Sequence, residues 1–90
     1  MKKEDVIKAI ILAVGGTSYS SWRIGLTNDP ATRKAYWRDT EKEDVTTWKQ
    51  WPADSLKDAQ DIETLFIGKG MKGGTGGDLS DNETVYVYTF

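Results

Sequence analysis

The run of residues 22–37 constrains the fold most, because it predicts a short strand that passes directly into a helix. Its first part alternates between the two faces of a strand. One face carries Ile24 and Leu26, and the other carries Arg23, Gly25 and Thr27. Asp29 can then cap the free amide groups of a helix, and Pro30 suits its first position. We therefore expect a helix from Pro30 to about Trp37, and a fold that combines helices with a sheet.

Two further helices are expected where apolar residues recur at helical spacing. The first covers residues 6–14 behind an acidic start, and Gly15 follows as a stop signal. The second is capped by Ser55 and ends near Gly68. Its buried stripe is predicted to contain Leu56, Ala59, Ile62 and Phe66.

Two further strands complete the predicted fold. Residues 45–51 are rich in β-branched and aromatic side chains, and Pro52 is expected to end this strand. Residues 84–90 alternate between two faces. One face carries Val85, Val87 and Thr89, and the other carries Tyr86, Tyr88 and Phe90. The prediction is an α+β domain with a small, three-stranded, mainly antiparallel sheet flanked by helices.

Composition restricts the chemistry and the setting. A chain of 90 residues supports one compact domain, so residues 1–90 are expected to fold as a single unit. It has no cysteine and no histidine, so any catalysis depends on carboxylates, tyrosine, lysine, serine or threonine. The apolar run at 10–14 is too short to cross a membrane, and a cytoplasmic protein is expected. The net charge of -2 means that a nucleic acid must be held by a local patch.

Glu63 falls inside the predicted apolar stripe of the helix at 55–68. A carboxylate in such surroundings needs a cation or hydrogen-bond donors to offset its desolvation. Arg33 or a divalent metal ion could supply that charge. The structural alternatives are a simple Glu63–Arg33 ion pair, or a helix turned so that Glu63 lies at the rim of the stripe.

The strand and helix at 23–33 resemble a signature of the GIY-YIG nucleases. That signature has an aromatic-Ile-Gly triplet, then a Thr or Ser two residues on, an acidic helix cap and an arginine. The positions in register are Ile24, Gly25, Thr27, Asp29 and Arg33. Ala59, four residues before Glu63, is similar to the family's second-helix motif, in which the glutamate binds a metal.

The resemblance implies phosphodiester hydrolysis. Arg33 is then expected to contact the scissile phosphate, and Glu63 to hold Mg²⁺ or Mn²⁺, while a tyrosine helps to activate water. Arginine suits phosphate oxygens, and a hard cation on one carboxylate keeps open positions for water and substrate. Tyr36 lies on the turn beyond Arg33 and is a candidate catalytic residue, with Trp37 at the family's usual position.

The chain departs from the family pattern at two places. Arg23 stands where the triplet has its tyrosine, and residues 17–21 leave no room for the first signature strand, Gly-Ile-Tyr. We hypothesise that residues 84–88 replace that strand in a circularly permuted domain. In that case Tyr86 or Tyr88 would face the site, from a strand that lies beside Ile24 and Gly25. The alternative is an ordinary edge strand with exposed tyrosines.

Substrate contacts are expected from two places. Arg23 and Thr27 share one strand face, and Lys69 and Lys72 lie in a glycine-rich loop at 68–77 that could cradle a phosphate. The alternative for this loop is a flexible connection. The leading hypothesis is a divalent-metal-dependent endonuclease or nucleic-acid-binding domain, with DNA as the expected partner and no membrane association. The other hypothesis is a catalytically inactive module that binds a protein partner. The sequence does not indicate an oligomeric state.

Overall fold

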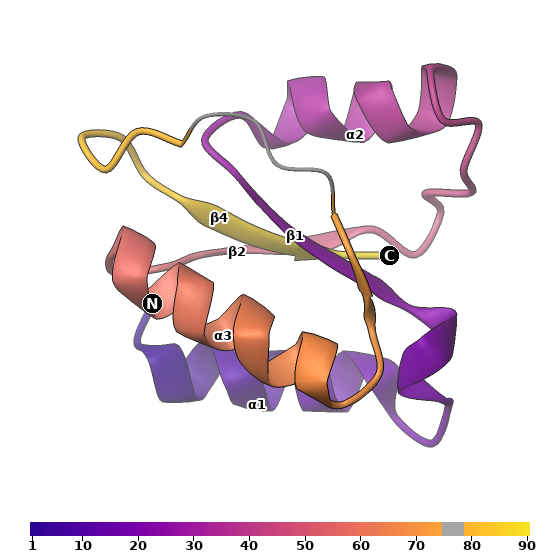
Figure 1. Cartoon of the computed structure of the whole chain (residues 1–90), viewed down its shortest axis with the longest axis horizontal. Helices are drawn as coiled ribbons and strands as arrows, with labels where there is room; N and C mark the ends of the chain where they lie inside the picture. The colour runs from indigo at the N-terminus through magenta and orange to yellow at the C-terminus, as the bar shows by residue number, and fades with distance from the viewer. Residues whose placement is uncertain (75–78) are drawn as a thin grey trace.

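The computed structural model describes residues 1–74 and 79–90 of the chain (Figure 1). Within these residues, α-helices cover both faces of a four-stranded sheet, which confirms the predicted α+β class. The α-helices are α1 (Lys3–Val14), α2 (Pro30–Asp39) and α3 (Leu56–Gly68), and a short 3₁₀ helix covers Tyr19–Ser21. The strands are β1 (Arg23–Thr27), β2 (Lys49–Pro52), β3 (Lys72–Gly73) and β4 (Tyr86–Thr89). No helix among the described residues is long and apolar enough to cross a membrane.

The sheet has the order β2-β4-β1-β3, so β4 lies between β1 and β2 and pairs antiparallel with both. The prediction of three strands was wrong, because β3 forms inside the glycine-rich segment and pairs parallel with β1. A strand of two residues has no side-chain alternation to reveal it. Buried Met71 and the backbone bonds from Lys72 N to Trp22 O and from Gly74 N to Ile24 O fix it in place. Residues 75–78 of the expected loop lie outside the described residues.

The second predicted strand also begins later than expected. Residues 45–48 form a turn, in which the backbone N–H of Trp48 donates to the carbonyl of Val45. The carboxylate of Asp44 accepts a hydrogen bond from Thr46 N at 2.9 Å, and such a local bond competes with strand pairing. Strand β2 therefore covers Lys49–Pro52 and includes the proline at which it was expected to end.

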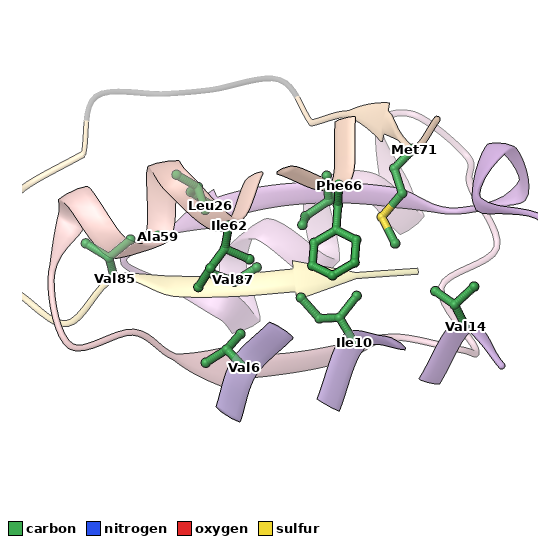
Figure 2. Close-up of a cluster of buried hydrophobic side chains, with 11 residues drawn as sticks. Val6, Ile10, Val14, Leu26, Ala59, Ile62, Phe66, Met71, Val85 and Val87 are labelled. Atoms are coloured by element: carbon green, nitrogen blue, oxygen red, sulfur yellow. The ribbon is translucent and has the colours of Figure 1, made fainter. Parts of the chain in front are cut away.

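The main core lies between the sheet and the pair of helices α1 and α3 (Figure 2). The predicted stripe of α3 is confirmed, since Ala59, Ile62 and Phe66 are each 0% exposed and Leu56 packs against this core. From α1 come Val6, Ile10 and Val14, from the sheet come Ile24, Leu26 and Val87, and Val85 joins them from just before β4. One face of β1 and one face of β4 therefore point into this core, as their alternation predicts.

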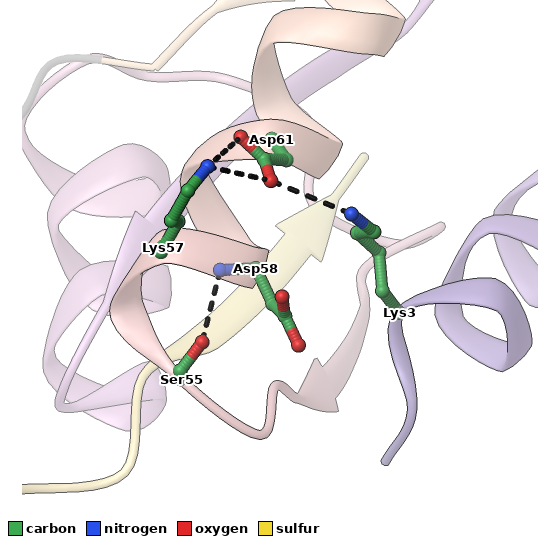
Figure 3. Close-up of polar contacts among 5 residues, drawn as sticks. All are labelled: Lys3, Ser55, Lys57, Asp58 and Asp61. Carbon is green, nitrogen blue, oxygen red and sulfur yellow. Dashed lines mark hydrogen bonds and ion pairs between the residues drawn. The ribbon is translucent and has the colours of Figure 1, made fainter.

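The start of α3 is fixed by polar contacts (Figure 3). The hydroxyl of Ser55 accepts a hydrogen bond from Asp58 N at 3.1 Å, which confirms the predicted N-cap. The Asp61 carboxylate accepts from Lys57 within α3 and from Lys3 of α1, at 3.2 and 3.4 Å. Of these partly exposed ion pairs, the one between Lys3 and Asp61 links α1 to α3.

A second, aromatic cluster lies on the opposite face of the sheet, beneath α2. It is formed by Trp37, Val45, Tyr88 and Phe90. The indole of Trp48 stacks on Tyr88 with ring centroids 4.5 Å apart and planes inclined by 8°. Trp48 therefore has the packing role that is common for a tryptophan near a core.

Candidate functional site

The central pairing of the sheet places the C-terminal tyrosines beside strand β1. In the β1–β4 ladder Tyr88 is opposite Gly25, and Tyr86 is opposite Thr27. The prediction that the last strand neighbours Ile24 and Gly25 is confirmed. The alternative of an edge strand with exposed tyrosines is wrong, because β4 is a central strand and Tyr88 is fully buried.

A pocket of about 230 Å³ opens where β1 passes into α2. Its lining includes Arg33, Thr27 and Tyr36, which are three of the residues predicted from sequence, together with Asp29 and Thr32. The strand ends at Thr27 and the helix begins at Pro30, so the tight junction brings these side chains together. This pocket is the main concave feature at the predicted site.

The cap of α2 forms one wall of the pocket. Asp29 accepts hydrogen bonds from the backbone N and the hydroxyl of Thr32, at 3.2 and 2.8 Å. These bonds lower the pKa of the Asp29 carboxyl, so it is ionised at neutral pH. The hydroxyl of Thr27 accepts from Asp29 N at 2.9 Å and ties the cap to the end of β1. The pocket wall is therefore held by a connected set of local bonds.

Arg33 and Tyr36 form the opposite wall. The guanidinium carbon of Arg33 lies 5.1 Å from the centre of the Tyr36 ring, a cation–π arrangement that holds the arginine at the pocket. The Tyr36 hydroxyl donates to a Glu41 carboxylate oxygen at 2.6 Å, just beyond the end of α2. An arginine with five donors in this position suits a phosphate group.

Tyr88 lies beneath α2 and is enclosed on all sides. Its hydroxyl accepts a hydrogen bond from Trp37 Nε1 at 2.9 Å. A Cβ atom on Gly25 would overlap this hydroxyl, and one on Gly74 would lie 2.7 Å from it. The two glycines therefore leave the space that the phenol occupies. Because Tyr88 is 0% exposed, it does not touch solvent in this structure, whereas Tyr86 is half-buried.

Charged residues from three elements influence the pKa of the Tyr88 hydroxyl. Burial raises the pKa of the Tyr88 hydroxyl, and the hydrogen bond from Trp37 opposes this rise. The positive charges of Arg33 and Arg23 also lower the pKa, whereas the negative charge of Glu63 raises it. Arg33 and Glu63, which come from helices on opposite faces of the sheet, therefore shift the pKa of this phenol in opposite directions.

Glu63 is half-buried on α3, and burial raises the pKa of its carboxyl. It lies at the edge of the apolar stripe, as one of the structural alternatives expected. Among the described residues it forms no ion pair with Arg33, and it does not contribute to the lining of the pocket. The same part of the chain holds no group of three or more acidic side chains that could enclose a metal ion.

The remaining predicted contacts lie toward the start of β1. The Arg23 guanidinium donates to the carbonyl of Gly73, lies 4.6 Å from the Trp37 ring and is 4.0 Å from the Glu43 carboxylate. Lys72 pairs with Arg23 in the β1–β3 ladder. The ammonium of Lys69 lies 5.8 Å from the Tyr19 ring. These three residues are thus separated from the pocket, which is at the Thr27 end of the strand.

Sequence reasoning missed two features of the site. For Trp37, the sequence indicated only a position on the turn after Arg33. Its hydrogen bond to Tyr88 was not predicted, because the two residues are 51 apart in the chain. The close approach of Gly74 to Tyr88 depends on β3, which no sequence pattern indicated. Comparison of the chain with models of known families, with curated proteins and with solved structures gave no match.

Proposed function

We propose that this domain binds nucleic acid through a backbone phosphate and hydrolyses its phosphodiester bond with a divalent metal ion. The observation that carries the proposal is the pocket in which Arg33, Thr27 and Tyr36 meet at the start of α2. Arg33 offers fixed, permanently charged donors to phosphate oxygens. The hydroxyls of Thr27 and Tyr36 add polar contacts at the same place.

The polymer that we propose is DNA. The chain has a net charge of -2, so attraction must come from the pocket rather than from the whole surface. Asp29 adds a negative charge to the pocket that Arg33 lines, which reduces the net attraction for an anion. Weak binding of this kind helps an enzyme that must release two nucleic-acid products after cleavage.

Glu63 fits a metal ligand in its chemistry. It is a partly desolvated carboxylate with no cation partner among the described residues, and a divalent ion would offset that desolvation. Bound Mg²⁺ or Mn²⁺ would polarise the phosphate and lower the pKa of a water molecule. The protein's part is then to hold the ion through Glu63 and the phosphate through Arg33.

The tyrosines take different parts in this proposal. Tyr86 and Tyr36 are partly exposed and are the candidates to contact substrate or the attacking water. Tyr88 is buried and acts through the residues around it. The arrangement of β4 beside β1 supports the circularly permuted GIY-YIG domain that the sequence motifs imply.

The alternative is a catalytically inactive module of the same fold that binds a protein partner. Arg23 favours this alternative, because it stands in place of the family tyrosine and is held by Gly73, Trp37 and Glu43. With such a structural role, Arg23 does not replace the missing phenol.

Cleavage assays separate the two functions. The wild-type protein is incubated with supercoiled, linear and branched DNA in Mg²⁺ or Mn²⁺, beside Arg33→Ala and Glu63→Gln. We expect each substitution to lower the cleavage rate about 100-fold or more, since removal of one group that stabilises the transition state has that effect. Lys34→Ala is the matched control, because Lys34 neighbours Arg33 on α2 but does not line the pocket, and it should cleave normally.

The same assay can also give the result that contradicts the proposed nuclease function. A wild-type protein that neither cleaves any of these DNAs nor binds them in a salt-sensitive manner supports the protein-binding module. Chelation of the divalent ion should stop cleavage by the wild type, and cleavage that continues would contradict the role of Glu63.

A further inference from the structure

Helix α2 contributes most of the residues that line the pocket, Arg33 among them, yet it buries few side chains against the sheet. Of its 10 residues only Trp37 is buried, with 2% of its surface exposed. By contrast, α1 and α3 each bury three side chains in the main core. The docking of α2 therefore depends mainly on the surroundings of Trp37, with the half-buried Tyr36 packed against the same aromatic cluster.

Trp37 is held by a specific polar contact as well as by packing. Its indole N–H donates to the Tyr88 hydroxyl at 2.9 Å, and both residues are buried. Indole nitrogen is only a donor, so a single orientation of the ring satisfies it here. Tyr88 in turn cannot shift easily, because Trp48 stacks on its ring and Gly25 closes against its hydroxyl.

Arg33 and Trp37 are four residues apart on α2 and therefore share one side of the helix. Trp37 is buried and bonds to Tyr88 of β4, so this side of the helix faces the sheet. The pocket lies between that side and the end of β1. A change in how Trp37 sits would consequently move Arg33 relative to Thr27.

We infer that the hydrogen bond from Trp37 to Tyr88 docks α2 on the sheet and thereby sets the position of Arg33 in the pocket. Trp37 is then a positioning residue, and Tyr88 is its fixed partner. The docking stands on the contacts alone, whereas its consequence for phosphate binding rests on the proposed function.

Amide hydrogen exchange tests the docking without any assay of activity. Trp37→Phe keeps an aromatic ring but removes the donor, and Tyr88→Phe removes the acceptor while keeping the ring. In both variants the amides of α2 should exchange about fivefold faster, as expected for the loss of about 1 kcal/mol of local stability. Amides of α1 and α3 should change less. The double variant should exchange like the single ones, because the same bond is already lost.

Trp48→Phe is the matched control. It removes the indole N–H that donates to Gln50 but keeps an aromatic ring to stack on Tyr88, and neither partner of the Trp37–Tyr88 bond is changed. It should not raise exchange selectively in α2. Exchange in Trp37→Phe that rises equally in all three helices, or not at all, would overturn the docking.

Titration with inorganic phosphate tests the positioning of Arg33, followed through the Arg33 side-chain N–H resonance. We expect weaker binding by Trp37→Phe and Tyr88→Phe than by the wild type and by Trp48→Phe. Equal affinity in all four proteins would overturn the positioning role. Selective exchange in α2 without phosphate or DNA binding by the wild type would leave the docking intact and contradict the proposed function.

Discussion

Thr89 is a buried residue whose hydroxyl has no hydrogen-bond partner among the described residues. Its side chain is 0% exposed, and it follows Val87 on the face of β4 that points into the main core. Valine has the same branched shape without the hydroxyl. We therefore expect Thr89→Val to raise the free energy of unfolding by about 1 kcal/mol, because an unsatisfied buried polar group is removed.

Urea denaturation measures this change, with Thr27→Val as the matched control. Thr27 is also a buried threonine on a neighbouring strand, but its hydroxyl accepts from Asp29 N. Thr27→Val should lower stability by about 1 kcal/mol, since it leaves that donor unpaired. Two threonine variants that change stability in the same direction would contradict this reading of the core.

At the scale of single residues, sequence reasoning named three residues that line the pocket but misjudged the burial of a tyrosine. Arg33, Thr27 and Tyr36 lie close in the chain, so the local strand-to-helix junction brings them together. Tyr88 was expected to face a site, but it is buried by Trp37 and Trp48, whose contacts no local pattern reports. Helical periodicity placed Glu63 inside the apolar stripe of α3, whereas its side chain is only half-buried, as the alternative of a position at the rim expected.

Helix α2 begins with a cap that can be tested by pH. The pKa of Asp29 falls below its ordinary value of 3.8 on folding, because Thr32 donates hydrogen bonds to the carboxylate from its side chain and its backbone. The folded chain therefore binds this proton less readily than the unfolded chain. The stabilisation is complete above about pH 4 and is lost as the pH falls through the lower folded pKa.

Asp29→Asn isolates that effect, since asparagine can still cap the helix but does not titrate in this range. In urea unfolding, the wild type should lose stability relative to Asp29→Asn as the pH is lowered from about 5 to 2. A difference between the two proteins that stays constant over this interval would show that the Asp29 carboxylate is not engaged by Thr32.

The elements themselves were predictable in proportion to their length. The three α-helices follow from periodicity and from caps at Asp29 and Ser55, and the strand at 23–27 follows from alternation. The predictions for two elements, β2 and β3, were wrong for identifiable reasons. The start of β2 is displaced by the local bond at Asp44, and β3 is a pairing of two backbone residues that leaves no trace in side-chain pattern.

For the whole molecule we expect one cooperative unfolding transition. The main core and the aromatic cluster lie on opposite faces of the same sheet, and the central strand β4 contributes to both, with Val87 in the core and Tyr88 in the cluster. A variant with Trp22→Phe and Trp51→Phe leaves Trp37 and Trp48 as fluorescent reporters of the aromatic cluster. Their urea transition should coincide with that of far-ultraviolet circular dichroism, which reports the helices. Separate midpoints would indicate two independent units.

The order of the strands in the sheet was the feature that the sequence predicted least well. Strand order depends on contacts between distant segments, and only the hypothesis that residues 84–88 lie beside Ile24 and Gly25 anticipated one of these pairings. That pairing is confirmed. The parallel addition of β3 and the position of β2 at the other edge follow from long-range packing that local pattern does not encode.

The central place of β4 also dictates an order of events during synthesis. Strands β1 and β2 come earlier in the chain, but each forms its antiparallel ladder with β4 and not with the other. When residues 1–70 have emerged from the ribosome, the segments of β1, β2 and the three α-helices are present. The strand β4, with which β1 and β2 both pair, has not yet emerged. Because long-range pairing of this kind slows folding, the emerging chain must remain soluble until residues 86–89 arrive.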